Sequence, residues 1–187
     1  MAARRAASSL PGPHRAPDLP GEAGPDDLLL DRQLCFSLYA ASRAVVRAYG
    51  PLLDAHGLTY PQYVVLLALW GEDGRRWTVG ELGDAVQLDG GTLTPLLKRL
   101  ERDGWVRRRR DTGDERRVVV EVTPEGWALR DRVIGVPRAL AGQLGLTLED
   151  GVRLKRQLDE LTRVLRAAEA SGSESAPGSD GLSADER

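Results

Sequence analysis

The sequence predicts a mainly α-helical fold of the α+β class, in which one β-hairpin interrupts a series of helices. Helical patterns dominate residues 26–168. Within them, WVRRRRDTGDERRVVVEV predicts two strands, because the central DTGDE has turn chemistry. Tails rich in Pro, Gly and Ser flank this domain at residues 1–25 and 169–187, and we expect both to be disordered. The element order is that of a winged helix-turn-helix with flanking helices that could dimerise.

Composition fits one domain of ordinary size. The chain has 187 residues, 41% of them apolar, and its net charge is −2. One cysteine, Cys35, excludes an intramolecular disulfide framework and suggests a reducing compartment. No apolar run approaches the ~18 residues of a membrane-spanning helix, and the N-terminus does not have the pattern of a secretory signal. We therefore expect a cytoplasmic protein without a membrane partner.

Capping signals mark the predicted helices. The first helix should start near Asp26 or Asp27, bend at Gly50-Pro51 and end at Gly57. The second starts near Pro61 and the third at Thr78, which has the spacing of a capping box with Glu81. The fourth, TLTPLLKRLERDG, ends at Gly104 and has either Asp89 or Thr94 as its cap. The last two are opened by Thr123-Pro124 and by Thr147 to Asp150, and the final one has the leucine stripe Leu154, Leu158, Leu161 and Leu165.

Positive charge is concentrated on the fourth helix and the hairpin. Residues 98–117 contain nine Lys or Arg and five Asp or Glu, so this segment is about +4 and the remainder about −6. In a winged helix-turn-helix, the helix enters the major groove and the hairpin contacts phosphates or the minor groove. The candidate DNA-binding residues on the helix and hairpin are Gly90, Gly91, Thr92, Thr94, Lys98, Arg99, Arg107, Arg109, Arg116 and Arg117. The alternative is that RRRR is merely a solvated strand face.

Three segments, QLCFSLYAASRAVVRAYGPLL, LTYPQYVVLLALW and TVGELGDAVQLDGGTLTPLLKRLERDGWVRRRRDTGDERRVVVEVTPEG, closely resemble the MarR family of bacterial repressors. More narrowly, the chain resembles the organic hydroperoxide resistance regulators over about residues 28–168. This resemblance implies a homodimer with interlocked terminal helices that binds a pseudo-palindromic double-stranded DNA operator. The chain departs from the family pattern at Gly90, where a serine is common, and in its long Pro-rich N-terminus.

The resemblance also implies a role for each residue of the redox site. Cys35 would sense an organic hydroperoxide, and its oxidation would release the DNA. Tyr49 and Tyr60 would hydrogen-bond the cysteine. Asp114 and Arg116 match a wing pair of the family, which adds Asp114 to the candidate DNA-binding residues and implies that the arginine lies in the minor groove. Apolar neighbours of Cys35 lead us to expect a preference for organic over hydrogen peroxide.

The spacing of Cys35 and Tyr49 adds a geometric expectation. On one continuous helix, 14 residues separate them by ~21 Å along the axis, so they cannot touch within one chain. Tyr49 should therefore come from the other subunit of a two-fold dimer. We also expect Cys35 to lie at least two turns into its helix, where the helix dipole has little effect on the sulfur.

The chain has no second cysteine that could form a disulfide with Cys35. Oxidised Cys35 would be a sulfenic acid, and its resolving thiol must come from outside the chain. We expect a mixed disulfide with a low-molecular-weight thiol.

Three other functions remain open. One is a repressor released by a small aromatic or phenolic ligand, with Cys35 purely structural. A thiol peroxidase would need a base or cationic partner, for which only His56 is available in the folded part. A structural nucleoid protein is disfavoured by the acidic chain. No spacing indicates a metal site or a phosphate loop, so we expect no catalytic residue, metal or cofactor.

Overall fold

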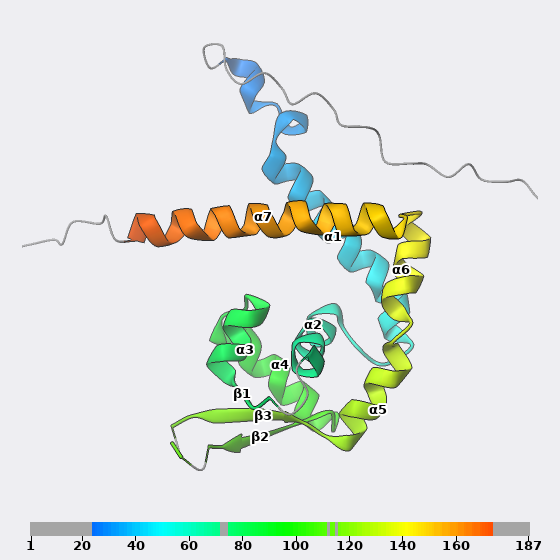
Figure 1. The fold of residues 1–187 in the computed structure, drawn as a ribbon, viewed down its shortest axis with the longest axis vertical. Helices are drawn as coiled ribbons and strands as arrows, with labels where there is room; N and C mark the ends of the chain where they lie inside the picture. Colours follow the sequence, from blue (N-terminus) through cyan, green and yellow to red (C-terminus); the bar gives the residue numbers. More distant parts are fainter. Residues whose placement is uncertain (1–23, 72–74, 112, 115, 174–187) are drawn as a thin grey trace, which may run out of the picture. The chain divides into compact units, whose positions relative to one another are not determined.

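The computed structural model describes residues 24–71, 75–111, 113–114 and 116–173, and it has the predicted mainly helical fold with an antiparallel sheet (Figure 1). Elements up to residue 143 form one compact unit, and residues from Leu144 onward belong to another. Among the described residues, no helix is both long and apolar enough to cross a membrane. The elements are η1 (Pro25–Leu28), η2 (Leu30–Arg32), α1 (Leu34–Asp54), α2 (Tyr60–Gly71), β1 (Trp77–Thr78), α3 (Val79–Val86), α4 (Gly90–Arg102), β2 (Val106–Arg110), β3 (Val118–Val122), α5 (Pro124–Val133), α6 (Val136–Leu144) and α7 (Leu148–Ser173).

The predicted hairpin is part of a three-stranded sheet with the order β1-β3-β2. In the hairpin, Arg107 lies opposite Glu121 and Arg109 opposite Val119. The third strand, β1, was not predicted, and it pairs Trp77 with Val120. A strand of two residues is too short to show an alternating pattern, so periodicity cannot reveal it.

The predicted start of the first helix is wrong. Leu29 and Gln33 both have extended backbones, so two short 3-10 helices precede α1, which begins at Leu34. The side-chain amide of Gln33 donates hydrogen bonds to the carbonyls of Asp27 and Leu29. It thereby occupies acceptors that a continuous helix would use for backbone N–H groups. As a result, Cys35 is the second residue of α1 instead of lying two turns inside it.

From Leu34 onward, α1 is continuous to Asp54 and includes Pro51. Pro51 cannot donate a backbone hydrogen bond, yet the helix does not end there. Cys35 and Tyr49 therefore lie on one helix, which was the premise of the distance argument above.

The core lies between α2, α3, α4, α5 and the sheet. Its fully buried side chains include Leu66, Leu82, Leu93, Leu97, Leu100, Val120 and Leu129. Trp70 and Trp77 are buried, and Trp105 and Trp127 are partly buried and pack against the same core. Gly126 lies where no side chain fits, because a Cβ would overlap the carbonyl oxygen of Trp105. This close approach fixes the start of α5 against the base of the hairpin.

The helix α7 carries the predicted leucine stripe. Leu154, Leu158 and Leu165 are 40–53% exposed in this single chain, which leaves an apolar face uncovered. The helix is capped as predicted, since the Thr147 hydroxyl accepts a hydrogen bond from the Asp150 N–H at 3.1 Å. It continues to Ser173, beyond the expected domain end at residue 168, because AAEA is a strong helix-forming segment. The other residues of the two predicted tails, 1–23 and 174–187, lie outside the described residues.

Candidate nucleic-acid interface and cysteine site

The helix pair α3–α4 is set by local hydrogen bonds that the sequence predicts. At the start of α3, the Glu81 carboxylate accepts from the Thr78 N–H at 2.8 Å, and the Thr78 hydroxyl accepts from the Glu81 N–H at 3.2 Å. The helix ends at Gln87, whose φ of 57° is left-handed. The Leu88 carbonyl then passes 2.9 Å from where a Cβ of Gly83 would lie, so this tight connection needs a glycine.

Asp89 caps α4, which decides between the two predicted caps. Its carboxylate accepts from the Thr92 N–H at 2.9 Å and from the Thr92 hydroxyl at 3.0 Å. These bonds, the backbone one first, lower the pKa of Asp89. Thr94 is not a cap but a helical residue, and Pro95 lies inside the first turns of the helix. The exposed start of α4 is therefore held by hydrogen bonds from within the chain.

The helical candidates for DNA contact share the exposed face of α4. Leucines at positions 93, 96, 97 and 100 bury the opposite face in the core. The solvent-facing candidates are Gly90, Gly91, Thr92, Thr94, Lys98 and Arg99. This division agrees with the amphipathic pattern of a recognition helix.

The arginines of β2 divide between the two faces of the sheet. Alternation along the strand puts Arg107 and Arg109 on one face and Arg108 on the other. On the first face, Glu121 of β3 lies 3.9 Å from Arg109 and 3.6 Å from Arg76. Arg109 is thus partly neutralised, whereas Arg107 has no ion pair within the described part of the chain.

The turn of the wing holds Arg116 outward. The Asp114 carboxylate accepts from the Arg116 N–H at 3.1 Å and from its Nε at 3.2 Å. The Arg116 side-chain hydrogen bond is the main reason that the pKa of Asp114 is lowered. With 92% of its side chain exposed, Arg116 projects from the wing on a short anchored turn.

On the other face, the wing, α3 and α4 enclose a basic cavity of about 440 Å³. Arg117 lies 3.7 Å from Glu81, which links the return strand of the wing to the capped start of α3. The sequence prediction omitted Arg108, whose guanidinium faces this side. Because all four residues of RRRR are basic, the sequence could not show which arginine turns inward. The cavity is lined by Thr78, Val79, Gly80, Thr94, Leu97, Arg108, Arg116, Arg117 and Val118.

Cys35 lies in the first turn of α1 and is exposed in this chain. It is therefore not a space-filling residue of the chain's own core. Its neighbours Leu34 and Phe36 are also exposed, at 64% and 38%. Such an uncovered apolar helix start is typical of an interface with another chain.

The two predicted tyrosines meet each other but not Cys35. The rings of Tyr49 on α1 and Tyr60 on α2 lie 5.0 Å apart between centroids. Tyr63, which the sequence prediction missed, lies 5.8 Å from Tyr49. Burial, followed by the neighbouring Tyr60, raises the pKa of Tyr49. Because α1 is continuous, this cluster and Cys35 of the same chain are ~21 Å apart along the helix.

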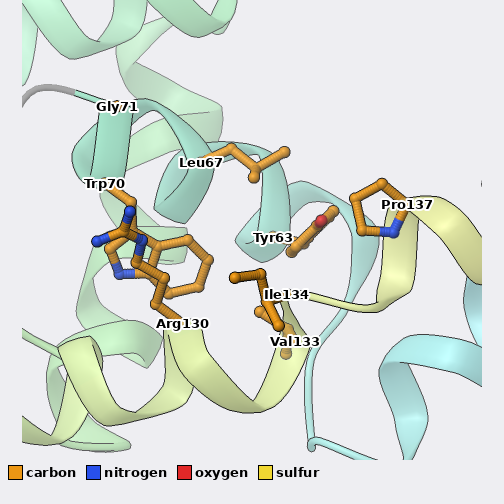
Figure 2. Close-up of a pocket in the computed structure, with 8 residues that line it drawn as sticks. All are labelled: Tyr63, Leu67, Trp70, Gly71, Arg130, Val133, Ile134 and Pro137. Carbon is orange, nitrogen blue, oxygen red and sulfur yellow. The ribbon is translucent and has the colours of Figure 1, made fainter.

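An apolar pocket of about 270 Å³ opens beside the tyrosine cluster, between α2 and the α5–α6 segment (Figure 2). Tyr63 is 1% exposed, and its hydroxyl has no hydrogen-bond partner in the described part of the chain. No group of three potential metal ligands occurs among the described residues. The pocket is lined by Tyr63, Leu67, Trp70, Gly71, Arg130, Val133, Ile134 and Pro137.

Comparisons with known proteins identify the family. The chain is 41% identical over 140 residues to the organic hydroperoxide resistance transcriptional regulator of Bacillus subtilis, covering 75% of this chain and 92% of that regulator. The chain belongs to the MarR/SarA family of transcriptional regulators. A family model described as transcriptional regulator SarA/Rot matches residues 47–133 of this MarR/SarA regulator. The predicted class, a DNA-binding regulator and not an enzyme, is confirmed.

Two further proteins are similar to this MarR/SarA regulator, one in sequence and one in both sequence and structure. It is 48% identical over 147 residues to the HTH-type transcriptional regulator TtmR of Methylorubrum extorquens, covering 78% of this chain and 74% of TtmR. A structure of reduced AbfR bound to DNA has 36% sequence identity and a TM-score of 0.63. That match covers 74% of this chain and 95% of AbfR, a protein of Staphylococcus epidermidis. The shared fold includes the winged helix-turn-helix described above.

Proposed function

We propose that this MarR/SarA regulator is a homodimeric repressor that senses organic hydroperoxides through Cys35 and then releases its operator. The observation that carries the proposal is the position of its only cysteine, exposed in the first turn of α1 among uncovered apolar side chains. The relative from Bacillus subtilis is an organic hydroperoxide resistance regulator. Solved structures of AbfR include the reduced and the overoxidized protein, each bound to DNA, and a disulfide-formed protein. The hydroperoxide in the first name and the disulfide in the last support a redox role for Cys35.

The proposed chemistry begins with the Cys35 thiolate, because only the deprotonated sulfur attacks a peroxide efficiently. Sulfur bonds to the terminal peroxide oxygen, the O–O bond breaks, and the departing alkoxide takes up a proton to become an alcohol. Sulfur is oxidised to sulfenic acid, and the peroxide is reduced. A low-molecular-weight thiol then displaces water from the sulfenic acid and leaves a mixed disulfide. Cys35 lies in the exposed first turn of α1, where a peroxide can reach the sulfur, instead of two turns inside the helix as predicted.

In the proposed dimer, the tyrosines near the sulfur come from the other subunit. Cys35 cannot reach Tyr49 or Tyr60 of its own chain, whereas two antiparallel α1 helices would bring each cysteine to the partner's cluster. The exposed leucines of α7 would cover one another in the same dimer. An adduct on Cys35 would then lie between the subunits, where it can change the spacing of the two α4 helices.

The test is DNA release by peroxide. A duplex selected by the wild-type protein from a random-sequence pool serves as the operator, and its binding is followed by fluorescence anisotropy. Cumene hydroperoxide plus free cysteine should release this duplex from the wild-type protein but not from Cys35→Ser. Release from Cys35→Ser, or no release from the wild-type protein, would refute the proposal.

The apolar pocket supports a second candidate function, release by a small aromatic acid. Tyr63 contributes a phenol to its lining, and Arg130 supplies a positive charge (Figure 2). In this case, salicylate would release the duplex equally from the wild-type protein and from Cys35→Ser. If salicylate causes neither DNA release nor an increase in thermal stability, this second candidate is wrong.

A further inference from the structure

One contact joins the recognition helix directly to the wing. The Glu101 carboxylate, in the last turn of α4, accepts hydrogen bonds from the Arg108 backbone N–H at 2.8 Å, from Nε at 2.9 Å and from Nη2 at 2.6 Å. The two side chains are only 34% and 25% exposed. The Arg108 backbone N–H and guanidinium lower the pKa of Glu101, so the carboxylate is anionic at neutral pH. Three charge-assisted bonds on one carboxylate make this the most fully bonded ion pair among the described residues.

The contact also gives a hydrogen-bond acceptor to a backbone N–H at the edge of the sheet. β2 is an edge strand, because the order is β1-β3-β2. The Arg108 N–H on its open side has no strand to pair with, and Glu101 supplies the missing acceptor. The guanidinium of the same residue reaches the basic cavity beside Thr94 and Arg116. Glu101 therefore holds both the backbone of the wing and one wall of the cavity.

We propose that Glu101 is a positioning residue for DNA recognition, which sets the distance between the exposed face of α4 and the wing arginines. Both surfaces must meet one duplex at the same time. The core holds the base of the hairpin through Val106 and Val120, and Glu101 adds a direct hydrogen-bonded link from α4 to the edge strand of the wing. A rigid link keeps the contacts of Thr94 and Arg116 in register with each other. This proposal rests on the operator binding that the proposed function requires, but not on Cys35.

Simple electrostatics predicts the opposite effect. Removing a carboxylate near a polyanion should strengthen binding to any DNA. If Glu101 positions the wing, Glu101→Gln should instead weaken binding to the selected duplex. The sign of the change thus separates the two explanations.

Glu121→Gln is the matched control. It also removes one carboxylate charge, from β3 of the wing instead of from α4. Among the described residues, Glu121 makes only two looser ion pairs, with Arg76 and Arg109. We expect this control to bind the selected duplex as tightly as the wild-type protein or more tightly.

The experiment measures affinity for the selected duplex and for a scrambled duplex, with each variant shown to be folded by circular dichroism. Glu101→Gln should bind the selected duplex about tenfold more weakly and the scrambled one no more weakly than the wild-type protein does. A role in stability alone would lower the melting temperature and leave the ratio of the two affinities of the folded protein unchanged. If the wild-type protein does not prefer the selected duplex in this assay, the proposed operator binding has failed. If the wild-type protein does prefer it and Glu101→Gln behaves alike, only the proposal for Glu101 has failed.

Arg108→Lys provides a second route if Glu101→Gln does not fold. It keeps the positive charge near the DNA but loses the two-pronged guanidinium contact. The same loss of preference for the selected duplex is expected. The proposal is overturned if the folded variants keep the wild-type affinity ratio, or if binding to both duplexes falls equally.

Discussion

Replacing Gly126 by alanine should destabilise the protein strongly, because the new Cβ would overlap the Trp105 carbonyl oxygen and lie 2.8 Å from a methyl carbon of Val122. Relief requires the start of α5 to move away from the base of the wing. Two hydrogen bonds oppose that movement: the Gly126 N–H donates to the Thr123 hydroxyl at 3.0 Å, and the Gly126 carbonyl accepts from Trp70 Nε1 at 3.2 Å.

The size of the effect follows from these contacts. Overpacking a rigid site costs about 1–3 kcal/mol. Loss of the cap and of the buried indole bond adds about 1 kcal/mol each. The free energy of unfolding should therefore fall by about 3–5 kcal/mol, which for a domain of this size corresponds to a melting temperature lower by roughly 6–20 °C.

The assay is thermal unfolding followed by circular dichroism at 222 nm. Gly142→Ala is the control, because it lies in the helix α6 and a Cβ there meets nothing within 4 Å. This control should be unchanged or slightly more stable, since alanine is the better helix former. A Gly126→Ala protein that melts within 2 °C of the wild type would refute the packing argument.

Three further predictions concern DNA contact, acid stability and oxidation. Arg116→Ala should weaken binding to the selected duplex and reduce the slope of log affinity against log salt by about 1; an unchanged slope would show that Arg116 makes no ionic contact with the DNA. The pKa of Asp89 is lowered on folding, so its stabilising effect is complete above the pKa of an unfolded aspartate and is lost as pH falls through the lower folded value. Asp89→Asn should therefore be less sensitive than the wild type to acidification below about pH 4, and equal acid sensitivity in urea titrations would contradict this. After treatment with cumene hydroperoxide and free cysteine, the intact mass should increase by one disulfide-linked cysteine per chain, and Cys35→Ser should gain none.

Local features of the fold were predictable, because their causes lie within a few residues. The pairs Thr78–Glu81 and Thr147–Asp150 form the hydrogen bonds expected from their spacing. The start of α1 was missed because LLLDRQL continues the apolar pattern, while the break depends on where the Gln33 side chain finds its acceptors. That difference changed the chemistry expected at Cys35.

The candidate site was only partly predictable for a similar reason. The helix face from Gly90 to Arg99 follows directly from amphipathicity. In contrast, a run of four arginines has no polarity contrast, so the inward position of Arg108 and its bond to Glu101 become visible only in the structure. Tyr63 joins the tyrosine cluster through the packing of α2 on α1, which sequence spacing alone does not report.

The measurement that tests the central claim most directly compares two quantities in the same samples. Aliquots from a titration with cumene hydroperoxide, with free cysteine present, are divided between anisotropy, which gives the fraction of selected duplex released, and intact mass spectrometry, which gives the fraction of Cys35 modified. We predict that release rises with Cys35 modification and is reversed by dithiothreitol. Release while Cys35 remains unmodified, or complete modification with the duplex still bound, would contradict the account.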